Sequence, residues 1–321
     1  MPHPLMTRIA AATDYLASRV PQSPLLSGGQ LRTSVAGRVW LKAESLLPTG
    51  SFKIRGATWR LSQLTAEEHK RGVIAYSTGN HAQAVAKAAR DVGTSALIVM
   101  SPDVPRAKVK ATERWGAEIV MAEPNSQARK ALAEQLAREQ RSVLVPPYDD
   151  DEIIAGQGSV GVELVRQWGV HPPAAVFVPI GGGGLIAGVA LALKHLAPQV
   201  LVIGVEPELE DDAARSWRGG YIVGTEGPSN SIADAIKVQR VGDRTFPLMR
   251  QFVDDIVLVS EADIGTATLR TLNEAHLVIE PGGAASIAAA LRTGIPGEVV
   301  AVASGGNVTL EALTALQQKF G

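Results

Sequence analysis

The stretch AVFVPIGGGGLIAGVALALKHL, residues 175–196, decides the fold class. It opens with a short apolar run, passes through four glycines and continues as a longer segment rich in Ala and Leu. A nearly continuous apolar run is typical of a parallel strand that is covered on both faces. We therefore predict a strand over residues 175–179, a tight turn at the glycines and a helix over residues 184–196.

The same alternation of short β-branched runs and longer Ala-rich segments continues on both sides of this stretch. Alternating strands and helices indicate βαβ units, and hence an α/β fold with open, twisted parallel sheets. The further strands are predicted over residues 39–42, 72–76, 96–100, 118–121, 143–145, 200–206 and 299–303, and the further helices over residues 51–64, 81–92, 105–115, 126–140 and 153–169.

Composition and charge narrow the class of protein. The chain has 321 residues, of which 45% are hydrophobic and 20% charged, enough to bury the core of one large domain or two medium ones. A net charge of -1 without a long basic run excludes a protein that binds nucleic acid non-specifically. The lack of cysteine excludes disulfides, zinc–thiolate sites and thiol nucleophiles. We see neither a secretory signal nor an apolar run long enough to span a membrane, so we expect a cytoplasmic enzyme.

The glycines at 181–184 form the sharpest local feature. Consecutive glycines let backbone N–H groups approach a ligand without interference from Cβ, and the start of the following helix adds partial positive charge. The stretch lacks both the Lys-Ser/Thr of a nucleotide P-loop and the GxGxxG spacing. We interpret it as a phosphate site, with a purely structural strand–helix turn as the alternative.

Lys53 is the candidate for covalent chemistry. It lies in the segment Thr49–Gly56, where Ser51 is a suitable N-cap and would place Lys53 in the first turn of a helix. A cation is unfavourable at that end of a helix, and an amine of lowered pKa suits Schiff-base chemistry. The alternative is an ordinary solvated surface lysine.

Two further polar loops follow predicted strands. Ser77-Thr78-Gly79-Asn80-His81 offers hydroxyls, an amide and N–H groups at a helix start, which suits a carboxylate. Ser304-Gly305-Gly306-Asn307-Val308 places a hydroxyl at the carboxyl end of a parallel strand, where ligands bind in open α/β sheets. Helix capping and a structural turn are the respective alternatives.

Taken together, these segments resemble the fold type II pyridoxal-phosphate enzymes. The segments SFKIRGA (51–57), STGNH (77–81), IAGQG (154–158), GGGG (181–184) and SGGN (304–307) stand in the family's order. The nearest members are the serine/threonine dehydratases, the serine racemases and the hydroxyaspartate dehydratases, and the similarity runs from about Leu25 to the last residue.

The resemblance implies two open parallel-sheet domains with the cofactor, pyridoxal phosphate, in the cleft between them. Residues 1–68 and 152–321 would form the large cofactor-binding domain and residues 69–151 the small one. The clearest compositional break, Pro146 to Asp151, lies near one of these boundaries, with a surface loop as the alternative reading. Members of the family are commonly dimers, so we expect a homodimer.

The resemblance also assigns roles at the cofactor. Lys53 would bond covalently to pyridoxal phosphate and then act as the base at the substrate Cα. Phe52 would pack near the cofactor ring and Asn80 would hydrogen-bond its 3′-oxygen. Ser304 would hydrogen-bond the pyridine nitrogen, where a hydroxyl, unlike Asp, does not force protonation and so favours elimination over transamination. The phosphate would be bound by the N–H groups of Gly181, Gly182, Gly183 and Gly184.

Further roles concern the substrate. Ser77, Thr78 and His81 would bind or orient the substrate carboxylate, with Arg129 as an additional candidate from a helix position similar to that in the racemases. Serine racemases use a Ser at the position of Thr78 as the acid–base opposite the lysine. Thr78 is therefore the second candidate catalytic residue, although its extra methyl group and restricted χ1 are a departure from the family's pattern.

An acidic loop, residues 206–212, is similar to a family loop that takes Mg²⁺ or Ca²⁺, with Mn²⁺ as a further possibility. Glu206 and Asp212 would supply carboxylates and Glu210 a backbone carbonyl. Oxygen ligands of this kind suit hard cations. The alternative is a solvated acidic loop.

We therefore expect a pyridoxal-phosphate-dependent dehydratase (ammonia-lyase) that converts threonine, serine or 3-hydroxyaspartate to a 2-keto acid and ammonia. The runner-up is a serine or aspartate racemase with side dehydratase activity. A lyase of another substrate class, such as a hydroxyectoine-pathway dehydratase, would carry the same motifs. A non-catalytic phosphate-binding protein, colourless when purified, is the alternative from a different class. The chain stops soon after Ser304, so we do not expect the regulatory domain of the biosynthetic threonine dehydratases.

Overall fold

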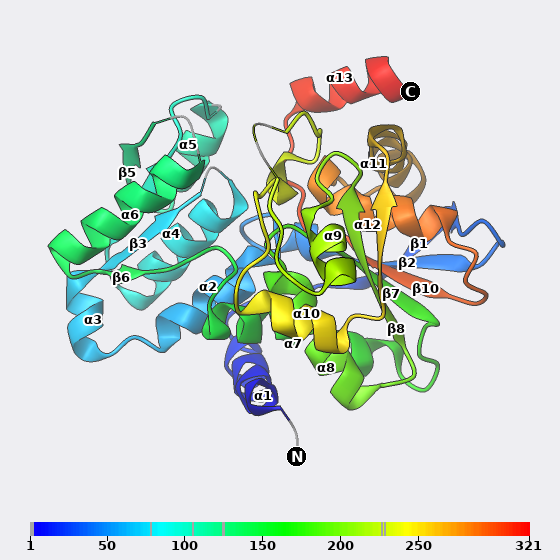
Figure 1. Cartoon of the computed structure of the whole chain (residues 1–321), viewed down its shortest axis with the longest axis horizontal. Coiled ribbons are helices and arrows are strands. Elements are labelled where there is room, and N and C mark those ends of the chain that lie inside the picture. The colour runs from blue at the N-terminus through cyan, green and yellow to red at the C-terminus, as the bar shows by residue number, and fades with distance from the viewer. Residues whose placement is uncertain (1–2, 78, 105, 124–125, 226, 228) are drawn as a thin grey trace.

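The computed structural model describes residues 3–77, 79–104, 106–123, 126–225, 227 and 229–321. The described part of the chain forms two separate sheets flanked by helices, as Figure 1 shows. One sheet has six strands and the other four. The predicted α/β class with parallel sheets is confirmed.

The larger sheet has the strand order β1-β2-β10-β7-β8-β9. All neighbours in it are parallel except β1, which pairs with β2 in the antiparallel sense. The sequence analysis missed β1, whose apolar pattern is interrupted over residues 27–30, and also missed β9, although residues 256–259 form a short apolar run. The strands are β1 (Leu25–Arg32), β2 (Arg38–Lys42), β7 (Ala175–Pro179), β8 (Leu201–Pro207), β9 (Asp255–Val259) and β10 (Val299–Val302).

The smaller sheet has the order β5-β4-β3-β6 and is parallel throughout. Its strands are β3 (Val73–Tyr76), β4 (Ala96–Met100), β5 (Glu118–Met121) and β6 (Val143–Leu144). All four lie inside the segment 69–151 that we expect to form the small domain. The domain boundaries themselves stay a prediction.

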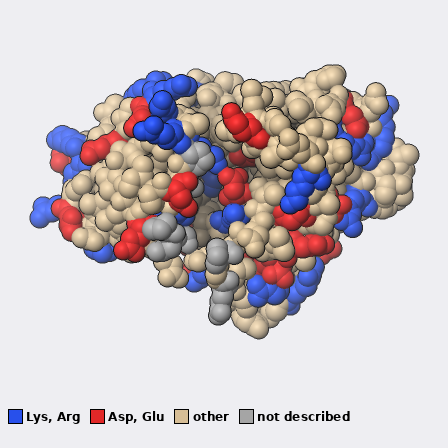
Figure 2. All heavy atoms as spheres, turned by 90° about the horizontal axis from the view of Figure 1, so that it is seen from above, with Lys and Arg blue, Asp and Glu red and all other residues tan. Residues whose placement is uncertain are grey.

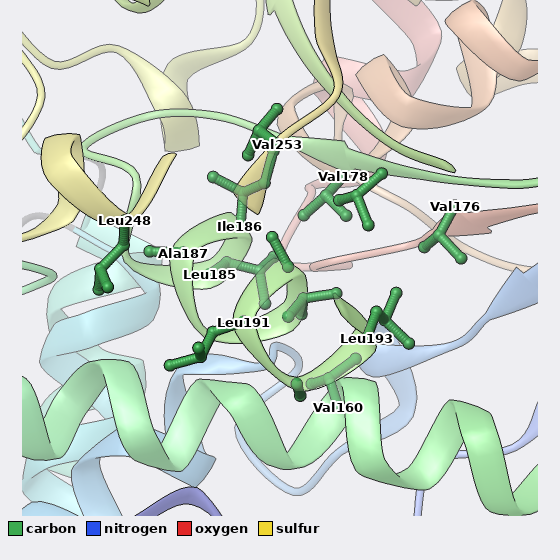
Figure 3. Packing of buried hydrophobic residues seen from close by; sticks show 14 of the residues in the cluster. Val160, Val176, Val178, Leu185, Ile186, Ala187, Leu191, Leu193, Leu248 and Val253 are labelled. Atoms are coloured by element: carbon green, nitrogen blue, oxygen red, sulfur yellow. The ribbon is translucent and has the colours of Figure 1, made fainter. Parts of the chain in front are cut away.

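Helices cover both faces of the larger sheet, and β7 shows how. Val176 and Val178 pack into one apolar cluster with α8 (Gly184–Leu196), whereas Ala175 and Phe177 pack into another with α12 (Pro281–Arg292). Figure 3 shows the first cluster, with Leu185, Ile186 and Leu193 of α8 beneath the strand. Both faces of β7 are therefore buried, which explains its uninterrupted apolar sequence.

The remaining helices complete the two units. Besides α8 and α12 they are α1 (Pro4–Leu16), α2 (Lys53–Ser62), α3 (Ala66–Arg71), α4 (Asn80–Val92), α5 (Arg106–Glu113), α6 (Ser126–Gln140), α7 (Asp151–Trp168), α9 (Asp212–Gly219), α10 (Thr245–Phe252), α11 (Glu261–Ala275) and α13 (Leu310–Phe320), with 3-10 turns η1 (Glu44–Leu46) and η2 (Asp234–Ile236). Among the helices that the structure describes, none has the length and apolar character needed to cross a membrane.

Candidate active site

The polar segments singled out in the sequence converge where the two sheets meet. The loops after β3, β7 and β10 all leave the carboxyl ends of parallel strands, the edge at which open α/β sheets bind ligands. Seen from above, the molecular surface is hollowed between the two halves of the molecule, with Lys, Arg, Asp and Glu side chains around the hollow (Figure 2).

Lys53 is the first residue of α2, as predicted, but Ser51 does not cap that helix. Phe52 already has helical dihedral angles and stands at the N-cap without a side-chain hydrogen bond. Ser51 is instead held in an antiparallel bridge with Gly305, and its fully buried hydroxyl finds no partner among the described residues. The predicted cap is therefore wrong, because pairing with the loop after β10 fixes Ser51 in an extended position.

The side chain of Lys53 is partly buried. Its Nζ lies 2.6 Å from the carbonyl oxygen of Pro147, to which it donates a hydrogen bond, and 5.1 Å from the centroid of the Phe52 ring. Burial lowers the pKa of Lys53 to about 8. A substantial fraction of this amine is consequently neutral near pH 8, as a nucleophile or a base requires.

The glycine loop has the geometry of an anion cradle at the start of α8. Gly183 takes φ +88°, which glycine adopts without strain. A Cβ on Gly182 would lie 2.3 Å from the ring of Tyr148, so only glycine fits against that ring. In the described part of the chain, none of the four N–H groups of Gly181–Gly184 is used in a loop, turn or cap hydrogen bond. These N–H groups and the positive end of α8 are free to bind a phosphate.

Asn80 is held in a chain of side-chain hydrogen bonds that the sequence analysis missed. Its Nδ2 donates to Glu280 Oε1 at 2.5 Å, and its Oδ1 accepts from Asn307 Nδ2 at 2.6 Å. Asn307 Nδ2 also donates to the carbonyl oxygen of Thr49 at 2.8 Å. The amide of Asn80 is thus fixed in orientation, with one N–H left to donate to a ligand.

Glu280 is a buried carboxyl at the centre of this chain. Burial raises its pKa to about 7, and the negative charge of Asp234 acts in the same direction. A Glu in the otherwise apolar run before the Pro-Gly-Gly start of α12 was the available sequence signal, because a charged side chain in a buried run needs a polar partner.

His81 faces the site as a neutral side chain. Its Nε2 lies 2.9 Å from the carbonyl oxygen of Val145, and the residue is 2% exposed. Burial and then the nearby charge of Lys53 lower its pKa to about 3. His81 is therefore neutral, so its predicted role in binding or orienting the substrate carboxylate would rest on hydrogen bonding and position rather than on charge.

The other predicted substrate residues are less closely defined. Ser77 is partly buried, and its Oγ accepts a hydrogen bond from the Gly79 N–H at 3.2 Å. Arg129, on α6, is partly buried, which lowers its pKa, while Asp103 opposes that shift. Among the described residues, no carboxylate pairs with Arg129 within 4.0 Å. Thr78 lies outside the described residues.

Comparisons with known proteins identify the family. The model of the family described as "Pyridoxal-phosphate dependent enzyme" matches residues 17–305. The chain belongs to the pyridoxal-phosphate-dependent enzymes. It is 38% identical to an L-threo-3-hydroxyaspartate ammonia-lyase from Pseudomonas sp (96% of this chain, 97% of the relative) and 36% identical to a serine racemase from Schizosaccharomyces pombe (96% and 95%). The crystal structure of a T.th. threonine deaminase superposes with a TM-score of 0.90 at 41% identity, over 96% of this chain and 99% of that one.

The residues present fit the cofactor of this pyridoxal-phosphate-dependent family. The glycine loop leaves free N–H groups for the phosphate, and Lys53 supplies a neutral amine. The buried hydroxyls of Thr49 and Ser51 lack partners in the described part of the chain. Ser304 is 4% exposed, and its carbonyl oxygen accepts the Phe52 N–H at 3.0 Å, which ties the loop after β10 to the residue before Lys53.

The acidic loop after β8 forms a second buried polar cluster. Both carboxylate oxygens of Glu206 accept N–H groups at the start of α9, from Ala213 at 3.0 Å and Ala214 at 2.7 Å. Glu210 Oε1 and Asp212 Oδ2 are buried without a hydrogen-bond partner among the described residues. Burial raises the pKa of Asp212 to about 7 and also raises that of Glu210.

The three predicted ligand side chains are 4% exposed or less, whereas Glu208 and Leu209 of the same loop are exposed. The described residues hold no group of three His, Cys, Asp or Glu side chains arranged to bind a metal. A cation here would therefore depend on backbone carbonyls and water in addition to the carboxylates, as the prediction for Glu210 assumes.

Proposed function

We propose that this chain is a pyridoxal-phosphate-dependent ammonia-lyase that converts a β-hydroxy-α-amino acid to a 2-keto acid and ammonia. The observation that carries the proposal is the partly buried amine of Lys53, with a pKa of about 8, facing the cleft beside a glycine loop with free N–H groups. Threonine, serine and 3-hydroxyaspartate are the candidate substrates, since similar proteins carry the names hydroxyaspartate ammonia-lyase and threonine dehydratase.

We assign the cofactor contacts as follows. Lys53 would hold the cofactor covalently, and Gly181–Gly184 would bind its phosphate. Asn80 would donate its remaining N–H to the 3′-oxygen, Ser304 would hydrogen-bond the pyridine nitrogen, and Phe52 would pack near the ring. When bound, pyridoxal phosphate supplies an electron sink for the negative charge that develops at the substrate Cα.

The residues of the chain would have separate roles in proton transfer, cofactor orientation and substrate binding. Lys53 would remove the substrate Cα proton with its neutral amine. Asn80 cannot rotate away from the cofactor because Glu280 and Asn307 hold both ends of its amide. Ser77 and the N–H groups at the start of α4 orient the substrate carboxylate, and Thr78 and Arg129 are the further residues assigned to it.

The proposal is tested by measuring 2-keto acid release from L-threonine, L-serine and the 3-hydroxyaspartate isomers with added pyridoxal phosphate. Lys53→Ala should lose both the yellow absorbance of the bound cofactor and turnover, whereas Lys110→Ala, an exposed lysine on α5, should keep both. Turnover by Lys53→Ala at the wild-type rate would refute the assignment. A yellow wild-type protein that releases no keto acid from any of these substrates would refute the ammonia-lyase proposal alone.

A second candidate is amino-acid racemisation, favoured by the 36% identity to the Schizosaccharomyces pombe serine racemase. Racemisation needs a proton donor on the cofactor face opposite Lys53, the role proposed for Thr78. Chiral analysis of the amino acid left after incubation with L-serine tests it. D-serine formation that Thr78→Ala abolishes would support the role, and its absence would leave elimination alone.

We also propose a divalent cation, Mg²⁺ in the first instance, at the acidic loop. Asp212 would supply a carboxylate and Glu210 its backbone carbonyl. Glu206 would ligate with the lone pairs that its hydrogen bonds to α9 leave free. The buried, unpartnered oxygen of Asp212 among the described residues supports the proposal, since a cation would offset the cost of burying it.

The proposal also covers domains, assembly and location. Residues 1–68 and 152–321 would form the large domain and residues 69–151 the small one, and the protein would be a cytoplasmic homodimer. Light scattering on the purified protein tests the dimer directly, because a monomer has 33.7 kDa. Limited proteolysis tests the domains, since cleavage should concentrate at their boundaries.

A further inference from the structure

One ion pair joins the two sheet units across the site. Lys108 lies on α5, which packs beside the smaller sheet, and Asp234 lies on η2, which packs against α12 of the larger unit. Lys108 Nζ and Asp234 Oδ2 are 2.6 Å apart. The pair thus connects segments that are 126 residues apart in the chain and belong to different sheets.

The Asp234 end of the pair is anchored to the glycine loop. A Cβ on Gly181 would lie 3.1 Å from the carbonyl oxygen of Ile236, the last residue of η2. A Cβ on Gly282 of α12 would lie 3.0 Å from Cβ of Ala235. The turn that carries Asp234 therefore packs directly on the loop that we assign to the cofactor phosphate.

Both charges of the pair also act on the buried carboxyl of the site. Burial raises the pKa of Glu280, and the charge of Asp234 raises it further. The hydrogen bond from Asn80 and the charge of Lys108 both lower it. Lys108 and Asp234 are the charged groups that face Glu280, from α5 and η2 respectively. The pair consequently lies close enough to Glu280 to affect the charge state of this carboxyl.

We propose that the Lys108–Asp234 ion pair is a latch that holds the two sheet units together over the cofactor cleft and opens to admit substrate. The latch deepens the function proposed above and rests on it. The side chain of Lys108 is 22% exposed and that of Asp234 50%, so water can compete for both. A pair of this exposure changes an equilibrium only a few-fold, which suits a contact that must break and re-form in each turnover.

Two other basic residues of α5 differ from Lys108 because they make no ion pair among the described residues. Arg106 and Lys110 lie on the same helix, are exposed, and make no ion pair among the described residues. Lys108 is distinguished from them by its partner on the other unit. Lys110→Met is therefore the matched control, because it removes a lysine from α5 without touching the latch.

The test compares Lys108→Met, Asp234→Asn, the charge swap Lys108→Asp with Asp234→Lys, and Lys110→Met as holoenzymes. We expect each single latch variant to raise KM and to speed the loss of yellow absorbance on dilution by about 2- to 5-fold. The charge swap should restore both quantities substantially, and Lys110→Met should match the wild type. Single latch variants that match Lys110→Met, or a charge swap that restores neither quantity, would overturn the latch.

A second readout separates the latch from a merely structural contact. Asp234→Asn should lower the pKa of Glu280 and Lys108→Met should raise it, so the pH dependence of cofactor absorbance should move in opposite directions in the two variants. Equal shifts in one direction, or none, would overturn the placement of the pair at the site. Cofactor loss and absorbance need no substrate, so these results stand apart from any failure of the ammonia-lyase proposal.

Discussion

Two buried charged clusters of this molecule differ in one respect that separates structure from function. Beneath α2, Arg55 and Lys42 meet Glu44 and Glu163, and every charge has an opposite partner within 2.7 Å. At the acidic loop, Glu210 and Asp212 keep buried oxygens that no described residue satisfies. A buried charge with all its partners is part of the architecture, whereas a buried carboxyl oxygen without a partner costs free energy unless the group is protonated or a ligand binds it.

The paired cluster illustrates how a charged side chain can be wholly structural. Burial alone would disfavour the charge of Arg55, but the carboxylates of Glu44 and Glu163 outweigh it and raise the pKa of Arg55. The same contact outweighs burial at Glu163 and lowers its pKa. Since Arg55 lies two residues after Lys53, the cluster fixes the helix turn that presents the reactive amine.

The largest effect is expected from breaking the paired cluster. Arg55→Met leaves Glu44 and Glu163 buried without their main partner, which should cost about 3–5 kcal/mol of unfolding free energy. Urea denaturation of wild type and variant measures the difference. Arg8→Met, which removes a surface pair with Glu152, is the control and should cost less than about 1 kcal/mol. Equal costs for the two variants would contradict the comparison.

The next effect tests the unpaired cluster. Mg²⁺ at about 100 times its dissociation constant should stabilise the wild type by about 2.7 kcal/mol, because it binds only the folded state. Asp212→Asn should lose most of this stabilisation. Asp211→Asn should keep it, since Asp211 is partly exposed and already pairs with Arg215 at 2.8 Å. Urea denaturation with Mg²⁺ or with chelator measures each case, and equal stabilisation of both variants would exclude Asp212 as a ligand.

The sequence alone predicts features that depend on neighbouring residues better than features that depend on contacts between distant segments. Most strands of the two sheets and Lys53 at the start of α2 were predictable, because apolar runs and the family's motifs are local. The extended position of Ser51 was not, since it depends on pairing with Gly305, 254 residues away in the sequence. The partner of Glu280 was not predictable for the same reason, because Asn80 reaches it from the other sheet unit.

The smallest effect is expected at Glu280, which is intermediate between the paired cluster and the acidic loop. Asn80 donates a hydrogen bond to it. Among the described residues, however, no Lys or Arg lies within ion-pair distance of it. Its folded pKa of about 7 lies above the ordinary value of 4.5. The folded state therefore binds a proton more tightly than the unfolded state does. Stability from this group is fully present below about pH 4.5 and is lost as the pH rises toward 7.

Glu280→Gln should remove this loss of unfolding free energy with rising pH. In the cofactor-free protein, we expect the wild type to lose roughly 1–2 kcal/mol more unfolding free energy than the variant between pH 5 and pH 7.5. Urea denaturation at a series of pH values measures this difference in slope. Glu274→Gln is the matched control, because Glu274 pairs with Arg270 and its pKa is lowered, so its charged form is already favoured. If Glu280→Gln kept the wild-type slope, the carboxyl would be charged throughout this range, and Glu280 would belong with the paired cluster.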